Sequence, residues 1–394
     1  MSCKYSAKFT NHDFLLHSVQ LIFQLSLNFA LQPILFSINH IKLIQYRNYA
    51  SVSYNLDARV IAVVGQNGIG KTNLLDAIYS LGFTKSYFGK SDGMSVQHGM
   101  MGFNVTGIFD FFQETKEISL VLRENNKKEL TVNKIPVVPF SSHIGKFPLV
   151  FIAPDDVELI NGGSEGRRRL IDTILSQTDH EYLIHLIRYN KTLADRNKYL
   201  KQAAFNGQTD HLLIDSFDSM LVSEGKPILE KRSAQLMGYI STVLDLYAFI
   251  SDDNERPSIN YVSGTSASTF EKDLANARQK DMILQRTTVG AHRDDLEIFL
   301  GDAPFKQVAS QGQKKSMLFS LKLAEFSLLN EHFKFPPILL LDDIFEKLDQ
   351  QRLEKLLDWV CIKNDGQVIL TDTHEDRVQK SLANKNVPFK LIKI

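Results

Sequence analysis

The stretch VVGQNGIGKTNLLDAIYSL, residues 63–81, places three glycines and a lysine between two apolar segments. Directly before the glycines, the apolar run RVIAVV (59–64) predicts a buried β-strand. The residues after them predict a helix over 73–81, because apolar side chains recur there at helical spacing: Leu74, Leu75, Ile78 and Leu81. The glycine-rich loop therefore joins a strand to a helix.

This loop has the pattern G-x-x-x-x-G-K-T, which indicates a phosphate-binding site. Its glycines let successive backbone N–H groups turn toward one centre, where they and the helix N-terminus can hold phosphate oxygens. Lys71 is expected to reach the β- and γ-phosphates, and the Thr72 hydroxyl is expected to bind Mg²⁺. The predicted nucleotide site comprises Gly65, Gln66, Asn67, Gly68, Ile69, Gly70, Lys71 and Thr72.

A loop of this kind needs an acidic residue that helps to hold the metal ion. The run ILLL (338–341) predicts a buried strand, and Asp342 follows at its tip, where we expect it to hold Mg²⁺ through water. Asp343 comes next and is placed to orient or deprotonate the water that attacks the γ-phosphate. The alternative is that the two aspartates only cap the following element.

A second phosphate cradle is predicted ahead of that strand. Ser310, Gln311, Gly312 and Gln313 precede an apolar-periodic helix, and a polar helix start with a glycine favours anion binding. An ordinary helix cap would explain Ser310 about as well. The position of this motif, one helix before the acidic strand, favours the cradle. Lys71 and Asp342 are 271 residues apart, so a large segment is inserted between the two halves of the site.

The order of these motifs resembles the ATP-binding cassette heads of the SMC type, and from about residue 38 the chain closely resembles the RecF family. The matching stretches are YRNY (46–49), GQNGIGKTNLLDAI (65–78), FIAPDDVELINGGSEGRRRLIDTILSQ (151–177), YNKTLADRN (189–197), RTTVGAHRDDL (286–296), SQGQ (310–313) and LLLDDIFEKLD (339–349). They run across nearly all of the chain after its first 37 residues.

The resemblance implies an α/β fold, a P-loop ATPase head of the ABC type (SMC-like) with an inserted helical arm. The expected divisions are an N-terminal extension of unknown role (1–37), the first part of the head (38–150), the arm (151–287) and the second part of the head (288–394). An arm of this length is too short for a long SMC coiled coil.

The resemblance also assigns roles in a nucleotide sandwich between two subunits. Ser310, Gln311, Gly312 and Gln313 of one chain are expected near the γ-phosphate that Lys71 and Thr72 of the other chain bind. Arg47 and Asn48 match a segment beside the nucleotide, and Asp349 matches a loop along the dimer seam. The expected catalytic residues are Lys71, Asp342, Asp343 and Ser310. Asp343 stands where the wider cassette family has glutamate and is one methylene shorter, which predicts slow hydrolysis.

Two further features depart from the wider cassette pattern. No obvious glutamine follows the VFIAPDD strand, and the final switch segment reads TDTHED (371–376). The sequence leaves open whether Thr373 or His374 faces the γ-phosphate.

Taken together, the resemblance implies a weak, Mg²⁺-dependent and DNA-stimulated ATPase of DNA replication and recombinational repair. An ATP-dependent homodimer is expected to bind double-stranded DNA at gaps and to help load the recombinase with recombination mediator proteins. The alternative is a cassette ATPase that serves another machine, as a transporter subunit or as a nucleotide-gated protein–protein switch without DNA binding. The long helical insert and the lack of a convincing membrane span disfavour transport.

The segment from 165 to 201 is mildly basic, with eight arginines and lysines against five acids. Arg167, Arg168 and Arg169 stand at a helix start expected to be capped by Ser164, where the helix dipole disfavours cations, so a phosphate or carboxylate partner is plausible. The alternative is a solvated face with intramolecular ion pairs. His292 is expected to be a hydrogen-bonded loop histidine rather than a catalytic group.

Composition limits the remaining choices. Lysines plus arginines number 45, as do aspartates plus glutamates, so any contact with nucleic acid must come from a local patch. Only Cys3 and Cys361 are present, which argues against a disulfide framework and favours the cytoplasm. Residues 14–41 carry no Asp, Glu, Lys or Arg, but a period of two over 21–31 favours an appended strand or a leader over a membrane anchor.

Overall fold

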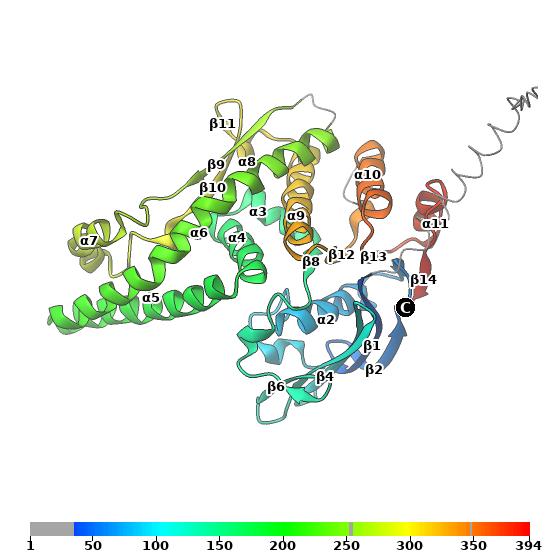
Figure 1. The fold of residues 1–394 in the computed structure, drawn as a ribbon, viewed down its shortest axis with the longest axis horizontal. Coiled ribbons are helices and arrows are strands. Elements are labelled where there is room, and N and C mark those ends of the chain that lie inside the picture. Colours follow the sequence, from blue (N-terminus) through cyan, green and yellow to red (C-terminus); the bar gives the residue numbers. More distant parts are fainter. Residues whose placement is uncertain (1–34, 252–254, 347–348) are drawn as a thin grey trace, which may run out of the picture.

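The computed structural model describes residues 35–251, 255–346 and 349–394. Figure 1 shows a head built on sheets, from which two long helices, α5 and α6, extend as an arm. The head is assembled from both ends of the described chain, and the arm lies between them in sequence. This arrangement agrees with the predicted SMC-like head with an inserted helical arm.

A five-stranded parallel sheet forms the centre of the head, in the order β14-β3-β13-β12-β8. Its strands are β3 (Val60–Val64), β8 (Leu149–Ile152), β12 (Ile338–Leu341), β13 (Val368–Asp372) and β14 (Lys390–Lys393). Every residue of β3, β8, β12 and β13 is buried, because both faces of the sheet are covered. Successive residues therefore pack into different cores, as Ala62 and Val63 do.

One face of this sheet is covered by helix α2 (Lys71–Phe83) and a six-stranded antiparallel sheet in the order β2-β1-β4-β5-β6-β7. The strands are β1 (Phe36–Tyr46), β2 (Tyr49–Asn55), β4 (Phe103–Phe111), β5 (Glu114–Leu122), β6 (Lys128–Val132) and β7 (Ile135–Pro136). Helix α2 contacts both sheets, and 11 of its 13 residues are buried. The helix that begins at the glycine-rich loop is thus held from two sides.

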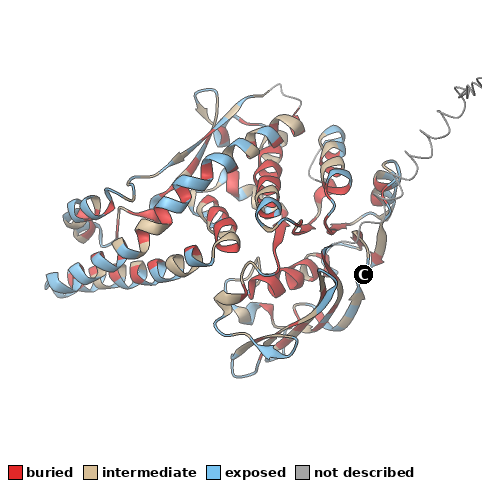
Figure 2. Cartoon of the chain, viewed as in Figure 1, coloured by how far each residue is buried: buried red, intermediate tan, exposed pale blue. Residues whose placement is uncertain are grey.

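The other face is covered mainly by α9 (Gln311–Phe333). Three more elements pack beside it: α10 (Gln350–Leu357), a π-helical turn (Asp358–Lys363) and α11 (Glu375–Ala383). In Figure 2, α9 is buried along most of its length, whereas α5 is exposed over much of its surface. Helix α9 therefore belongs to the core, and only its two ends, at Gln311 and at residues 330–332, are exposed to solvent.

The arm consists of α4 (Ser164–Thr178), α5 (His180–Asn206), α6 (His211–Ser251) and α7 (Phe270–Leu284). A three-stranded sheet in the order β11-β10-β9 packs against them, with strands β9 (Pro257–Val262), β10 (Asp295–Leu300) and β11 (Ala303–Pro304). The short helix α8 (Phe305–Val308) then leads into α9. The remaining short elements are η1 (Asp92–Ser95), η2 (Phe140–His143), η3 (Pro154–Val157), α3 (Glu158–Asn161), η4 (Ala291–Arg293) and η5 (Ile344–Glu346).

The predicted strands at 59–64 and 338–341 and the predicted helix at 73–81 are confirmed as β3, β12 and α2. The domain limits stay predictions. Strand β8 spans the limit drawn at 150/151, and β10 of the predicted second head part pairs with β9 of the predicted arm.

The predicted helix cap at Ser164 and the predicted pattern near the N-terminus have different outcomes. The predicted cap at Ser164 is wrong, since the N-cap is Gly163 and makes no side-chain capping bond. The pattern of the first 34 residues lies outside the described residues. Over the part of the chain that the structure describes, no helix combines the length and apolar character needed to cross a membrane.

A buried arginine joins several elements of the arm. Arg232 on α6 is 1% exposed and bonds Asp172 on α4 at 2.7 Å and Asp294, after η4, at 2.5 Å. It also donates to the Tyr182 hydroxyl at 3.0 Å. Asp294 is fully buried and accepts two further bonds, so its charge depends on this network for compensation.

We expect Arg232→Met to destabilise the protein by about 3 kcal/mol or more, because it leaves the Asp294 carboxylate buried without its cation. Guanidinium unfolding curves measure this. Arg256→Met, a change at an exposed arginine, serves as the matched control and should leave the midpoint within about 0.5 kcal/mol of wild type. Equal midpoints for the two variants would contradict the assigned role.

Candidate nucleotide site

Three loops meet at one edge of the parallel sheet. The glycine-rich loop follows β3, the acidic pair follows β12, and the switch segment follows β13. Strand β13 lies between β3 and β12, so the carboxyl ends of the three strands are neighbours. Ligands of open α/β sheets bind outside the carboxyl ends of the strands, which makes this edge the candidate site.

The glycine-rich loop has the geometry of a phosphate cradle. Gly70 caps α2 with a φ of 125°, and a Cβ atom there would lie 2.6 Å from the Asn48 Nδ2 atom, so only glycine suits this position. The Lys71 ammonium group lies over the loop and donates to the carbonyl oxygens of Gly65 at 2.8 Å and Gln66 at 3.1 Å. The N-terminus of α2 and the ammonium group thus converge on one place.

The segment after β1 supports this loop. Asn48 donates to the Ile69 carbonyl oxygen at 2.5 Å and accepts from the Asn73 amide at 2.8 Å. The predicted position of Asn48 beside the loop therefore has a structural basis. The neighbouring Arg47 is engaged elsewhere, since its guanidinium group bonds Asp76 at 3.2 Å. It also donates to the Ser86 hydroxyl and the Met94 carbonyl, so its nucleotide contact stays a prediction.

Thr72 and Asp342 come together as predicted. The Thr72 hydroxyl donates to Asp342 Oδ2 at 2.7 Å, and the Asp342 side chain is almost fully buried. Burial raises the pKa of this carboxyl, while hydrogen bonds from Thr371 and Thr72 act in the opposite direction. A hydroxyl and a carboxylate are hard oxygen ligands, and Mg²⁺ in such sites takes few protein ligands besides phosphates and water. The two residues therefore fit the predicted magnesium site.

Thr371, near the end of β13, connects both aspartates. Its hydroxyl donates to Asp342 Oδ1 at 2.7 Å and accepts from the Asp343 backbone N–H at 3.0 Å. Asp343 has a φ of 46°, in the left-handed region that non-glycine residues seldom adopt. The Thr371 hydroxyl thus holds Asp342 and helps to fix the unusual backbone of Asp343. Sequence reasoning missed this residue, although a threonine near the end of an apolar strand was a usable signal.

The second predicted cradle is a helix start with a full capping box. The Ser310 hydroxyl accepts from the Gln313 N–H at 3.2 Å, and the Gln313 side chain accepts from the Ser310 N–H at 2.6 Å. The structure is thus compatible with SQGQ as an ordinary helix cap and with SQGQ as a phosphate cradle, since a capped helix start can also face a phosphate. A Cβ atom at Gly312 would lie 2.4 Å from Arg352 Nη1, so α10 closely approaches this helix start.

The two cradles do not bond each other directly. Among the described residues, no hydrogen bond joins Ser310–Gln313 to Gly65–Thr72. Ser310 and Gln311 are exposed to solvent. This exposure leaves the helix start accessible to another molecule.

The other predicted residues follow β12 and β13 in the chain. Asp349 caps α10 and accepts from the Arg352 N–H at 3.0 Å. In the switch segment, Thr373 and His374 bond each other at 2.7 Å, and the His374 side chain is exposed. Both follow β13, so the choice between them stays open.

Several known proteins resemble this chain in sequence and in fold. Residues 37–391 match the family model described as RecF/RecN/SMC N terminal domain. The DNA replication and repair protein RecF of Cytophaga hutchinsonii is 39% identical over 341 residues, which cover 86% of this chain and 90% of that protein. RecF of Bacteroides thetaiotaomicron is 37% identical over 358 residues, or 91% of this chain and 96% of that protein. A solved structure of the recombination mediator protein RecF-ATPrS in the RecFOR pathway has a TM-score of 0.81 and 28% identity, covering 92% of this chain and 96% of that one.

We expect Thr371→Val to lower ATP turnover at least about tenfold, because removing a hydrogen bond to a charged group costs about 1.5–3 kcal/mol. The Mg²⁺ concentration for half-maximal turnover should rise, since Asp342 loses its fixed orientation. Thr371→Ser keeps the hydroxyl and should restore both values toward wild type. Steady-state ATPase assays across a Mg²⁺ titration measure them. Wild-type turnover with an unchanged Mg²⁺ requirement in the valine variant would refute this role.

Proposed function

This chain belongs to the RecF family within the RecF/RecN/SMC group, and we propose that it is an ATP-dependent DNA-binding protein of replication and recombinational repair. ATP closes two copies into a dimer on duplex DNA at gaps. The dimer helps to load the recombinase together with recombination mediator proteins, and slow hydrolysis releases it. We place this activity in the cytoplasm.

The observation that carries the proposal is that the start of α9 is exposed and forms no hydrogen bond with the glycine-rich loop of its own chain. The glycine-rich loop supplies the ammonium group of Lys71 and the N-terminus of α2. The α9 start offers Ser310 on the exposed surface of the same subunit. An ATP molecule held by the first cradle of one subunit and the second cradle of another would join the two copies. Dimerisation then depends on the γ-phosphate.

The proposed chemistry uses residues of the carboxyl edge. Lys71 leaves its loop carbonyls and neutralises the β- and γ-phosphates. Thr72 and Asp342 would hold Mg²⁺, which supplies charge neutralisation at the phosphates when bound. Asp343 orients the attacking water and receives its proton. Asp343 is one methylene shorter than the glutamate of the wider cassette family, and its backbone N–H is bonded by Thr371. We therefore expect it to position the water less well and turnover to be slow.

We expect Lys71→Met to abolish the ATP-dependent dimer by removing the charge that holds the phosphates. Ser310→Arg should leave ATP binding intact and block dimerisation, because the bulky cation occupies the seam. Sedimentation velocity with and without ATP measures the dimer, and a fluorescent ATP analogue measures binding by each variant.

The matched control separates the seam from helix capping. Ser310→Asp retains a good capping oxygen but places a negative charge against the γ-phosphate. It should therefore block the dimer as Ser310→Arg does, while Ser310→Thr should dimerise. Normal ATP-dependent dimers from both Lys71→Met and Ser310→Arg would refute the sandwich.

A gel-shift assay with gapped duplex DNA tests the DNA-binding half of the proposal. We expect ATP to strengthen binding of the wild type and to have no such effect on Lys71→Met. A protein–protein switch that never contacts nucleic acid would form ATP-dependent dimers yet give no shift with either gapped or intact duplex.

A further inference from the structure

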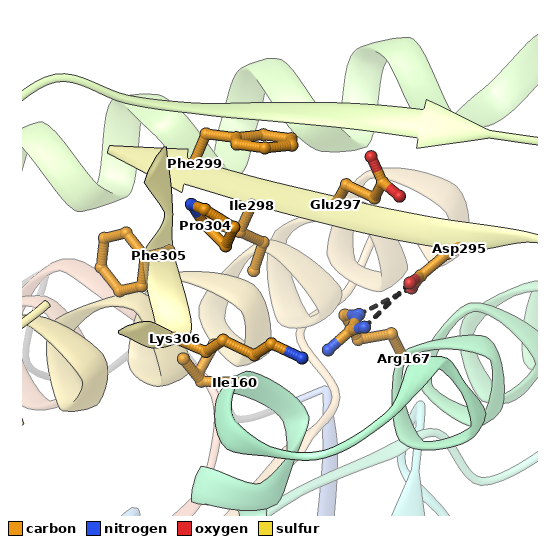
Figure 3. A pocket seen from close by; sticks show the side chains of 9 residues that line it. All are labelled: Ile160, Arg167, Asp295, Glu297, Ile298, Phe299, Pro304, Phe305 and Lys306. Atoms are coloured by element: carbon orange, nitrogen blue, oxygen red, sulfur yellow. Dashed lines mark hydrogen bonds and ion pairs between the residues drawn. The ribbon is translucent and has the colours of Figure 1, made fainter. Parts of the chain in front are cut away.

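The three consecutive arginines of α4 have different surroundings. Arg167 is 8% exposed and forms two bonds with Asp295, at 2.7 and 2.9 Å, as Figure 3 shows. It also donates to the carbonyl oxygens of Leu159 and Gly162. Arg167 thus makes four hydrogen bonds to acceptors of the protein itself. For this arginine, the structure agrees with the alternative that the basic segment forms intramolecular ion pairs.

Arg168 and Arg169 differ from this neighbour. Arg168 is half-buried, and one of its nitrogens donates to the Asp294 backbone carbonyl at 2.8 Å. Burial lowers the pKa of Arg168, the charges of Asp295 and Asp294 raise it, and the charges of Arg232 and Arg293 act in the same direction as burial. Arg169 is exposed, and within the described ranges its side chain has no hydrogen bond or ion pair. Neither guanidinium group has a carboxylate bonded to it.

A cavity of 280 Å³ lies between α4, α5 and η4. Two of its lining residues are already satisfied: Arg232 by its buried carboxylates, and His292 by Tyr189 at 2.8 Å and the Thr287 carbonyl at 3.1 Å. Burial lowers the pKa of His292 to about 4, so it is neutral near pH 7. The groups left for a ligand are the side chains of Arg168, Arg169 and Asn190, beside the carboxylates of Glu165 and Asp172. Asp172 already accepts from Arg232 and the Tyr182 hydroxyl.

Two more cations lie near these arginines. Lys85 follows α2 in the head, is exposed to solvent and is close enough to Arg169 for the two positive charges to interact. Arg293 ends η4 on the arm side and is exposed. No carboxylate of the described chain lies within ion-pair distance of either one. We call Lys85, Arg168, Arg169 and Arg293 the α4 cation cluster.

We propose that the α4 cation cluster binds the phosphodiester backbone of duplex DNA. This inference rests on the proposed function and names the surface that would carry it. Guanidinium groups match phosphate oxygens in pairs. Since the chain has a net charge of zero, attraction of DNA must come from a local excess of this kind. The cations come from both head and arm, which suits a row of phosphates better than a single anion.

The test is the salt dependence of duplex binding, measured by fluorescence anisotropy with ATP present. A plot of log K against log salt has a negative slope, and each lost phosphate contact should make that slope less steep by about 0.9. We expect such a decrease for Arg169→Ala and for Lys85→Ala. Arg256→Ala removes an exposed arginine just before β9, at the opposite end of β9 and β10 from Asp295, and should keep the wild-type slope. Sedimentation should show equal ATP-dependent dimers for all variants.

The outcomes separate the two proposals. If wild type binds duplex and both cluster variants keep its slope, the cluster is not the DNA surface, and the proposed function stands. If wild type does not bind duplex at all, both the proposed function and this inference fail. In that case, a rise in melting temperature with inorganic phosphate, lost in Arg169→Ala, would identify a free anion as the ligand.

Discussion

Two hydroxyl groups, from Thr72 and Thr371, hold the Asp342 carboxylate at the carboxyl edge of the parallel sheet. Each hydroxyl comes from a different neighbour, one from the helix after β3 and one from β13. The orientation of the Asp342 carboxylate therefore depends on the relative positions of three chain segments: the start of α2, the end of β13 and the loop after β12. A shift of any one of them changes the oxygens that would meet a metal ion. The nucleotide chemistry proposed for this chain depends on these two hydrogen bonds to Asp342.

Sequence reasoning located the features that are encoded locally. The glycine-rich loop, the strand before Asp342 and the helix after SQGQ each appear as short patterns, and the structure contains all three elements. Residues that act through long-range contacts were missed or left unresolved. The contact of Thr371 with Asp342 depends on the pairing of β12 with β13, in which Leu341 lies opposite Leu370, and the sequence does not give this register. The arginine run could not be divided from sequence alone, because Asp295 is 128 residues from Arg167.

Buried charges hold the elements of the arm together. Arg196 on α5 pairs with Asp218 on α6 and Asp281 on α7, while Arg232 on α6 pairs with Asp172 and Asp294. Such pairs strongly oppose separation of their partners, because an uncompensated charge would remain in the core. The arm contacts the head through α6, where Tyr239 donates to the Leu321 carbonyl in the middle of α9 at 3.0 Å. The packing of α6 against α9 therefore connects the arm to the helix that covers the parallel sheet.

The capping box at Ser310 has a consequence for the isolated subunit. Its Gln313 side chain already satisfies the Ser310 N–H, and the Ser310 hydroxyl already serves the Gln313 N–H. The N–H groups of Gln311 and Gly312, in the first turn of α9, have no acceptor among the hydrogen bonds of the described residues. An anion can therefore accept from them while both bonds of the capping box stay in place. The box fixes the conformation of this turn in the isolated subunit, so that binding at the helix end does not require the turn to be ordered first.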